Sequence, residues 1–350
     1  MISEITPVVK DNLFSLRTWS GDRAVLIYLS LISLLIHLFI NSEFGFHRDE
    51  FLYIALGEHL DWGFLEVPPL VAVIAFVSRL IFGHSYFAYH FFPALAGAAT
   101  VYFTGRTARE LGGNRFAQIL AACCVLASPA YLRSSSLFQP VVFEQLLVTV
   151  FVYCAVRLLK TENMKWWLAV GGVIGIGMMN KYSMLIFCLG LGAGLLVTPA
   201  RKMLGSRWPW TAALIAVMIF LPNLIWQYSQ NWPIFEHLQK LKETQFVHVS
   251  PMGFLIGQML MNLFSLPVWL AGIYFFLFSK QGRSFRMLGW IYAVPVVILL
   301  AASGKDYYLL PVYPMLFAGG ACLISSSAWI AQRSWIRISM AGSSFEGAHS

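Results

Sequence analysis

The sequence predicts an all-α integral membrane protein, and three of its features support this fold class. Of the 350 residues, 58% are hydrophobic and 11% are charged, whereas a soluble domain carries about 25% charged residues. Apolar runs of roughly 17–25 residues, the length that crosses a bilayer as a helix, recur along the chain. The basic residues are also unevenly distributed over the loops between these runs, as membrane topology requires.

About ten membrane-spanning helices are expected, packed as one bundle. The first run follows basic residues and lacks a small-residue cleavage site, so we interpret it as a span rather than a signal peptide. The predicted spans cover residues 24–40, 87–105, 116–132, 140–156, 166–179, 183–199, 210–228, 252–278, 287–302 and 307–324. We therefore expect a cytoplasmic N-terminus (1–23), a transmembrane domain (24–324) and a short cytoplasmic tail (325–350).

The charge distribution assigns a side of the membrane to each loop. With a cytoplasmic N-terminus, 17 of the 24 basic residues fall on the inner side, as the positive-inside rule requires. The seven on the outer side are Arg48, Arg79, Arg133, Lys181, Lys240, Lys242 and Lys305. The net charge of +8 therefore indicates topology rather than nucleic-acid binding. The two long loops, 41–86 and 229–251, are predicted on the outer side.

Both outer loops are expected to contain helices that do not cross the membrane. In the first loop, Glu50–Leu60 has a short amphipathic pattern. Pro68 and Pro69 are good helix-starting residues for Leu70–Phe82, which is too short to span comfortably. We interpret these two segments as juxtamembrane helices at the outer surface. In the second loop, Ile234–Glu243 is predicted as one amphipathic helix.

An acidic patch is the most distinctive feature of the first outer loop. Six of the 16 acidic residues fall within 24 positions. They are Glu43, Asp49, Glu50, Glu58, Asp61 and Glu66. Carboxylates beside a membrane cost free energy unless a charged or reactive group meets them there. The patch is therefore predicted to be the chemical centre of a membrane enzyme.

Cations from distant segments are predicted at the same membrane depth as this patch. Arg133 ends the third span, Lys181 separates the fifth and sixth, and Lys305 lies between the ninth and tenth, followed by Tyr307 and Tyr308. A carboxylate can take a proton from an acceptor hydroxyl, and cations can neutralise a leaving phosphate. Simpler interpretations stay open: Arg133 reaches lipid headgroups, and the tyrosines belong to an aromatic belt.

The sequence predicts neither a nucleotide site nor a defined metal site. No glycine-rich phosphate loop is present, and the five cysteines lie within apolar spans without a CxxC pair, which favours buried packing. Glu66 with a loop histidine is a candidate for a divalent cation, but no ligand spacing supports it. No other cofactor is expected.

Five segments in order resemble the family 39 glycosyltransferases of the GT-C class. These include the protein O-mannosyltransferases and the bacterial aminoarabinose and galacturonic acid transferases that act on lipid A or lipopolysaccharide core. The matching segments are His47–Tyr53, Leu65–Leu70, Arg106–Gly113, Asn180–Ser183 and Lys305–Pro314. The resemblance covers about residues 20–320.

This resemblance implies inverting transfer of a sugar from a polyprenyl-phosphate carrier to an envelope acceptor, which is lipopolysaccharide or lipid A, another glycan, or a protein. It implies a multi-pass protein of the bacterial inner membrane with a periplasmic active site. Asp49 matches the catalytic acid of the family's Asp-Glu pair, Glu50 its supporting neighbour, and Glu66 the acid before the proline segment. In the aminoarabinose branch a lysine often follows that glutamate, but Val67 stands here.

The remaining candidates for the donor phosphate are then Arg133, Lys181 and Lys305. Two other classes of function compete with this hypothesis. A non-catalytic lipid or sugar transporter would usually place charges at mid-membrane and often contain inverted repeats. A membrane scaffold would use the outer loops to bind a protein, which leaves the matched acidic, lysine and tyrosine segments unexplained.

Overall fold

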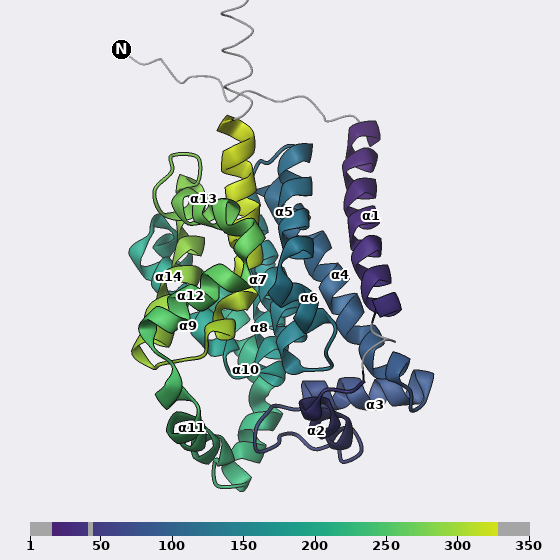
Figure 1. Ribbon diagram of the computed structural model, residues 1–350. Helices are drawn as coiled ribbons and strands as arrows, with labels where there is room; N and C mark the ends of the chain where they lie inside the picture. The colour runs from purple at the N-terminus through teal and green to yellow at the C-terminus, as the bar shows by residue number, and fades with distance from the viewer. Residues whose placement is uncertain (1–15, 41–44, 328–350) are drawn as a thin grey trace, which may run out of the picture.

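The computed structural model describes residues 16–40 and 45–327, and within these ranges it contains helices and loops but no strands (Figure 1). The all-α prediction is confirmed. The α-helices are α1 (Leu16–Ile40), α2 (Arg48–Leu56), α3 (Leu70–Phe82), α4 (Tyr86–Glu110), α5 (Arg115–Ala127), α6 (Pro129–Ser135), α7 (Pro140–Thr161), α8 (Trp166–Asn180), α9 (Met184–Val197), α10 (Arg207–Ser229), α11 (Pro233–Thr244), α12 (Pro251–Met261), α13 (Leu266–Leu277) and α14 (Arg286–Ala301). A last helix, Asp306–Ser327, begins with the 3-10 segment η6 (Asp306–Val312).

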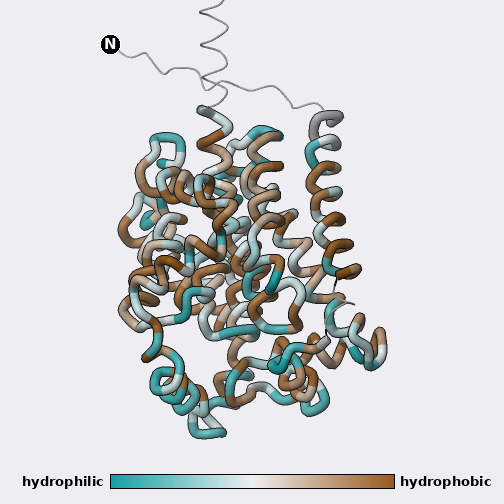
Figure 2. Tube along the Cα trace, viewed as in Figure 1, coloured by the Kyte–Doolittle hydropathy of each residue, from teal (hydrophilic) through white to brown (hydrophobic). Residues whose placement is uncertain are grey.

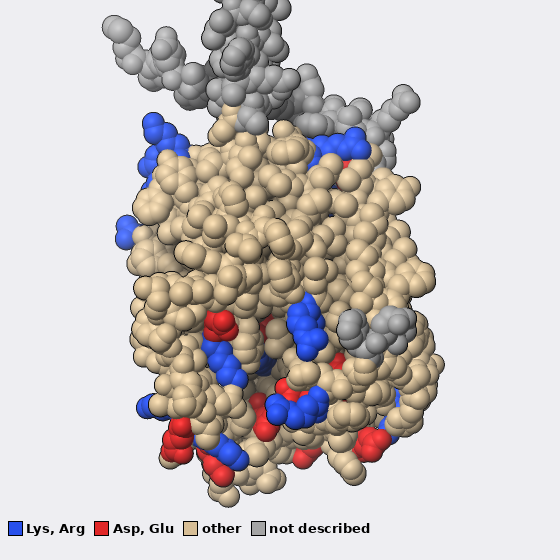
Figure 3. All heavy atoms as spheres, in the orientation of Figure 1, with Lys and Arg blue, Asp and Glu red and all other residues tan. Residues whose placement is uncertain are grey.

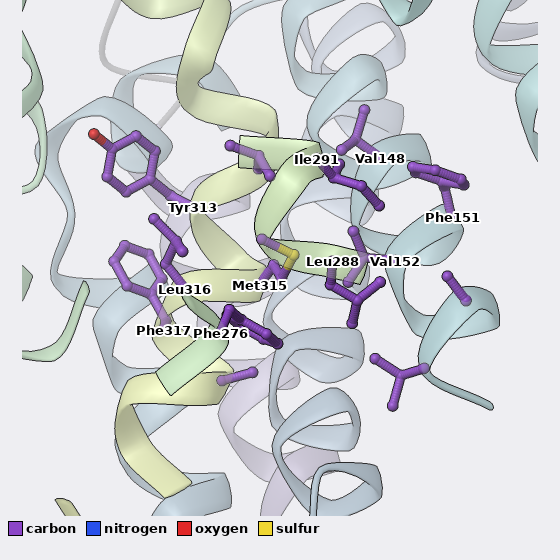
Figure 4. Close-up of a cluster of buried hydrophobic side chains, with 14 of the residues drawn as sticks. Val148, Phe151, Val152, Phe276, Leu288, Ile291, Tyr313, Met315, Leu316 and Phe317 are labelled. Carbon is purple, nitrogen blue, oxygen red and sulfur yellow. The ribbon is translucent and has the colours of Figure 1, made fainter. Parts of the chain in front are cut away.

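The long helices form one bundle around a shared apolar core. Helix α1 packs on α4, α4 on α7, α7 on α8, α8 on α10, and α9 on α14. Figure 4 shows part of this core: Val148 of α7 lies beside Ile291 of α14, and Leu316 and Phe317 of the last helix belong to the same cluster. This packing holds the ends of distant helices in fixed relative positions.

Five of the ten predicted spans are single helices that are long and apolar enough to cross a membrane: Gly21–Ile40, Pro140–Thr161, Arg207–Ser229, Arg283–Ala301 and Asp306–Ser327. Two others are helices that do not meet this measure. Helix α8 has only 15 residues, about 22 Å at 1.5 Å per residue. Helix α4 has 25 residues, but tyrosines, His90 and Pro93 make its first half less apolar than the other spans.

The other three predicted spans are broken rather than straight. The third is bent by 67° between α5 and α6, and the eighth by 77° between α12 and the segment Leu263–Leu277. The sixth turns by 100° after α9 into the 3-10 segment Pro199–Gly205. Pro129 lies at the break in the third span and Pro199 at the break in the sixth. Proline lacks the N–H that a continuing helix needs. If each bent pair crosses the membrane once, the described residues contain up to eight spans.

The juxtamembrane helices are present, with small differences in length. Helix α3 has the predicted bounds, and α11 is one residue longer at each end than expected. Helix α2 begins two residues earlier than predicted and ends at Leu56, with Gly57 as its C-cap. A Cβ atom on Gly57 would lie 2.6 Å from the Cβ of Ala75, so α2 and α3 approach closely there. All three helices lie at the lower end of the bundle in Figure 1.

Hydropathy and charge divide the bundle into a middle and two ends. Apolar residues dominate the middle, and polar residues gather at the lower end (Figure 2). Lys and Arg gather at the upper end, whereas both signs of charge surround a hollow at the lower end (Figure 3). Beyond Ser327, the predicted tail lies outside the described residues, as do residues 1–15 of the predicted N-terminal segment.

Candidate active site

A cavity of about 890 Å³ opens at the lower end of the bundle. It brings together residues from α2, the loop before α3, α6, the turn after α8, α11 and η6. Seven of the eight site residues proposed from the sequence line it: Asp49, Glu66, Arg133, Lys181, Lys305, Tyr307 and Tyr308. Figure 3 shows charged side chains of both signs around this hollow. The fold thus unites segments that are more than 250 residues apart in the sequence.

The first turn of α2 holds Asp49 at the cavity wall. His47 is the N-cap, and its Nδ1 accepts a hydrogen bond of 3.3 Å from the Asp49 backbone N–H. Arg48 Nε donates to Asp49 Oδ1 over 3.1 Å. The Asp49 side chain remains 41% exposed. A carboxylate in the first turn of a helix is favoured by the helix dipole, and here this accessible acid lines the cavity.

Glu50 is the one predicted site residue that does not line the cavity. Consecutive helical residues point about 100° apart, and Glu50 points into the protein, where it is fully buried. Its Oε2 accepts the His47 backbone N–H at 2.7 Å, and its Oε1 accepts the Phe138 backbone N–H at 2.6 Å. Burial by itself raises the pKa of Glu50, but the bonds from His90 and these N–H groups outweigh burial and lower it.

Lys181 is held by a buried carboxylate behind the cavity wall. Its Nζ donates to Glu144 Oε2 over 3.0 Å, and Ser183 Oγ donates to the other oxygen of Glu144. The same Nζ lies 4.5 Å from the ring centroid of Tyr308 and 5.3 Å from that of Tyr307. The charge of Lys181 is therefore already compensated by Glu144.

Arg133 and Lys305 differ from Lys181 in this respect. Within residues 16–40 and 45–327, neither has a carboxylate within the 4 Å of an ion pair. Burial and the charge of Lys181 lower the pKa of Lys305, while Asp49 and Asp306 oppose this shift. Among the described residues, the cavity thus presents two cations that no carboxylate pairs directly, although Lys305 Nζ also lies 5.6 Å from the Tyr307 ring centroid. A cation without a carboxylate partner is what an anion site needs.

Three residues around the cavity were missed by the sequence argument. Tyr53 lies one turn after Asp49, and burial followed by the charges of Asp49 and Glu66 raises its pKa, which keeps the phenol protonated. His237 of α11 lines the wall near Glu66. Glu144 gave a signal that was overlooked, because an acidic residue inside an apolar span is expensive and usually functional.

The structure does not strengthen the case for a metal. Glu66 and His237 line the same cavity, so the suggested pair is near one another. Across the described part of the chain, however, no group of three or more His, Cys, Asp or Glu side chains could hold a metal ion.

Comparison with known proteins extends this description. Residues 66–226 match the family model described as dolichyl-phosphate-mannose-protein mannosyltransferase. The lipid A galacturonosyltransferase RgtD of Rhizobium johnstonii is 25% identical over 276 residues, which are 75% of this chain and 56% of that protein. The undecaprenyl phosphate-alpha-4-amino-4-deoxy-L-arabinose arabinosyl transferase 2 of Proteus mirabilis is 25% identical over 331 residues, 85% of this chain and 58% of that protein. The chain thus spans a little more than half the length of these relatives.

Solved structures share the fold. ArnT from Cupriavidus metallidurans, bound to undecaprenyl phosphate, superposes with a TM-score of 0.72 at 17% identity, covering 93% of this chain and 64% of that one. The oligosaccharyltransferase of Archaeoglobus fulgidus gives a TM-score of 0.59 at 13% identity over 91% of this chain and 52% of that one. With the family match and the two curated relatives, the shared fold makes this chain similar to the GT-C glycosyltransferases.

Proposed function

We propose that the protein transfers a sugar from a polyprenyl-phosphate carrier to an acceptor hydroxyl in the cavity at the lower end of the bundle. The charge asymmetry of the loops supports an outer-side location for this end, which would be the periplasmic side in a bacterial inner membrane. The observation that carries the proposal is the convergence of seven residues, selected from the sequence, on one cavity.

The proposed reaction is a single displacement that inverts the anomeric centre. Asp49 accepts the proton of the acceptor hydroxyl as its oxygen bonds to the anomeric carbon. The bond from that carbon to the phosphate oxygen breaks, and the electron pair leaves with polyprenyl phosphate. Arg133 and Lys305 stabilise the charge that develops on this phosphate. Tyr307 and Tyr308 supply ring faces beside it for the sugar or the first prenyl units.

The named substrates of the relatives support the class of donor and acceptor. The matched proteins are named for lipid A and for undecaprenyl-phosphate-linked aminoarabinose. We propose a lipid-linked sugar as donor and an envelope glycolipid, most directly lipid A or lipopolysaccharide core, as acceptor. Val67 occupies the position where the aminoarabinose branch often has lysine, which favours a sugar other than aminoarabinose.

The test is transfer by the purified protein. Polyprenyl-phosphate sugars are supplied with lipid A or lipopolysaccharide in detergent, and the product is detected by mass spectrometry. Asp49→Asn should lower kcat by at least about 100-fold, the range for loss of a general base. Glu58→Gln is the matched control, since Glu58 lies in the same loop in an exposed pair with Arg79 and such pairs contribute little.

Two outcomes would contradict the proposal. An Asp49→Asn protein with full activity would remove Asp49 as the base. Movement of labelled lipid or sugar across vesicles by the wild-type protein, without any covalent product from the supplied donors, would favour a transporter instead.

A further inference from the structure

The buried face of α2 contains a hydrogen-bonded group that the proposed reaction does not use. Glu50 and His90 are both almost completely buried, and His90 Nε2 lies 2.9 Å from Glu50 Oε1. The other ring nitrogen, Nδ1, lies 2.8 Å from the backbone carbonyl oxygen of Tyr86. Each nitrogen of the His90 ring therefore faces an oxygen.

The partners decide which atoms carry protons. A carbonyl oxygen can only accept, so Nδ1 must carry the hydrogen that it shares with Tyr86. Glu50 already accepts two backbone N–H groups, from His47 and Phe138, one on each oxygen. This is the hydrogen-bonding pattern of an ionised carboxylate. Nε2 then also carries a hydrogen and donates it to Oε1, so the ring is doubly protonated.

The aromatic neighbours of His90 suit a cation. The Tyr86 ring stacks on the His90 ring with centroids 3.9 Å apart and an interplanar angle of 19°. The Phe46 ring lies 5.7 Å away. Aromatic faces stabilise a cation through their quadrupole, most strongly where water is excluded. The two rings therefore favour the charged form of the imidazole.

We infer that His90 is a buried imidazolium that, through Glu50, positions the first turn of α2 and so the orientation of Asp49. Glu50 joins three separate segments: α2 through the His47 N–H, α4 through His90, and the loop before α7 through the Phe138 N–H. Helix α2 has nine residues, too few to be stable alone. Its other extensive packing is on α3.

This arrangement gives the two acids of the Asp-Glu pair separate tasks. Asp49 is the catalytic residue that faces the cavity, whereas Glu50 and His90 are positioning residues that never touch a substrate. The inference rests on the proposed function for its catalytic part. Its structural part, a doubly protonated His90, stands independently of any activity.

The first measurement is NMR of the wild-type protein with ¹⁵N-labelled histidine in detergent at pH 7. The His90 signals are assigned by their absence from the spectrum of His90→Gln. We expect protons on both ring nitrogens of His90. A ring with a single protonated nitrogen would overturn the inference, and this readout needs neither substrate nor turnover.

The second measurement is kinetic and uses three variants. His90→Gln is neutral, and we expect a loss of about 10- to 100-fold in kcat, with the KM for the donor within about 3-fold of wild type, since one bond to a buried charge is lost. His90→Lys restores a cation for Glu50 and should recover most of the loss. His84→Gln is the control, because His84 is an exposed residue six positions away that bonds only the Tyr89 hydroxyl.

The outcomes separate this inference from the proposed function. Unchanged kcat in His90→Gln, with an active wild-type protein, would refute the positioning role alone. A wild-type protein that transfers no sugar would refute the proposed function, while the protonation of His90 is still decided by NMR. If His90→Gln does not fold, the His90 signals are assigned by their absence from the spectrum of His90→Lys, so the wild-type spectrum and this variant still test the inference.

Discussion

Replacing Lys305 by methionine tests how the cavity binds the donor phosphate. Lys305 lies in the cavity without a carboxylate partner among the described residues, whereas Lys181 is neutralised by Glu144. A hydrogen bond to a charged group contributes about 1.5–3 kcal/mol. At 1.4 kcal/mol for each factor of ten, Lys305→Met should weaken the binding of polyprenyl phosphate by about 10- to 100-fold.

The pH dependence of this binding follows from the shifted pKa of Lys305. Burial and the charge of Lys181 lower that pKa in the empty cavity. The anion binds to the protonated amine, so binding above the lowered pKa requires uptake of a proton. The affinity of the wild type for polyprenyl phosphate should therefore fall as the pH rises through this pKa. The affinity of Lys305→Met should not show this part of the pH dependence. The ratio of the two dissociation constants should shrink towards one at alkaline pH.

The assay is titration of the detergent-solubilised protein with polyprenyl phosphate at several pH values, followed by calorimetry. Lys305→Arg should keep most of the affinity and should not lose it at alkaline pH, because arginine stays charged. Lys242→Met is the control for an exposed outer-side lysine. Equal affinity of wild type and Lys305→Met at neutral pH would refute the assignment of Lys305, and so would a ratio that does not change with pH.

Two further predictions concern stability. Glu144→Gln leaves Lys181, which is only 18% exposed, without its carboxylate partner. We expect the loss of this hydrogen bond to a charged group to cost about 2 kcal/mol, seen as a lower melting midpoint, and an unchanged midpoint would contradict the pairing. Glu110→Gln should also lower the midpoint, because Glu110 bonds both Arg157 and Lys160. Burial opposes ionisation of Glu110, but these cations outweigh it and lower its pKa. The contribution of Glu110 to the free energy of unfolding is therefore fully present above the ordinary pKa of a glutamate, and it is lost as the pH falls through the lowered pKa of Glu110. A difference in melting midpoint between the wild type and Glu110→Gln that grows as the pH falls would contradict this.

The sequence predicted the parts of the fold that depend on local pattern. Apolar length and the placement of basic residues identified the helices and the end of the bundle that contains Asp49. The bends were not predicted, because an apolar run does not reveal where it turns. Pro129 was visible, but only the packing of α6 against α4 explains why the chain breaks at that point and brings Arg133 to the cavity.

For the site, residue type and topology identified the side chains that face the cavity, and the family resemblance gave Glu50 a supporting role, but the partners through which such residues act were not identified. Nothing in the pattern of α2 indicates that Glu50 points inward to His90, 40 residues later in the sequence. The partnership depends on the placement of α4 and of the Phe138 backbone. Glu144 is an intermediate case, because its isolation in an apolar helix was a visible signal, while its partner Lys181 was identifiable only from the folded chain.

Arg133 and Lys305, which no carboxylate pairs among the described residues, also have a consequence for turnover. A polyprenyl-phosphate sugar is a phosphodiester with one negative charge, whereas the polyprenyl phosphate that leaves is a monoester approaching two, because the second pKa of such a phosphate is about 6. Arg133 and Lys305 match the charge of the product better than that of the substrate. This charge match lowers the barrier to bond breaking, but it should also slow the release of polyprenyl phosphate. We therefore expect product release to limit turnover. We also expect polyprenyl phosphate to inhibit the reaction competitively with the donor.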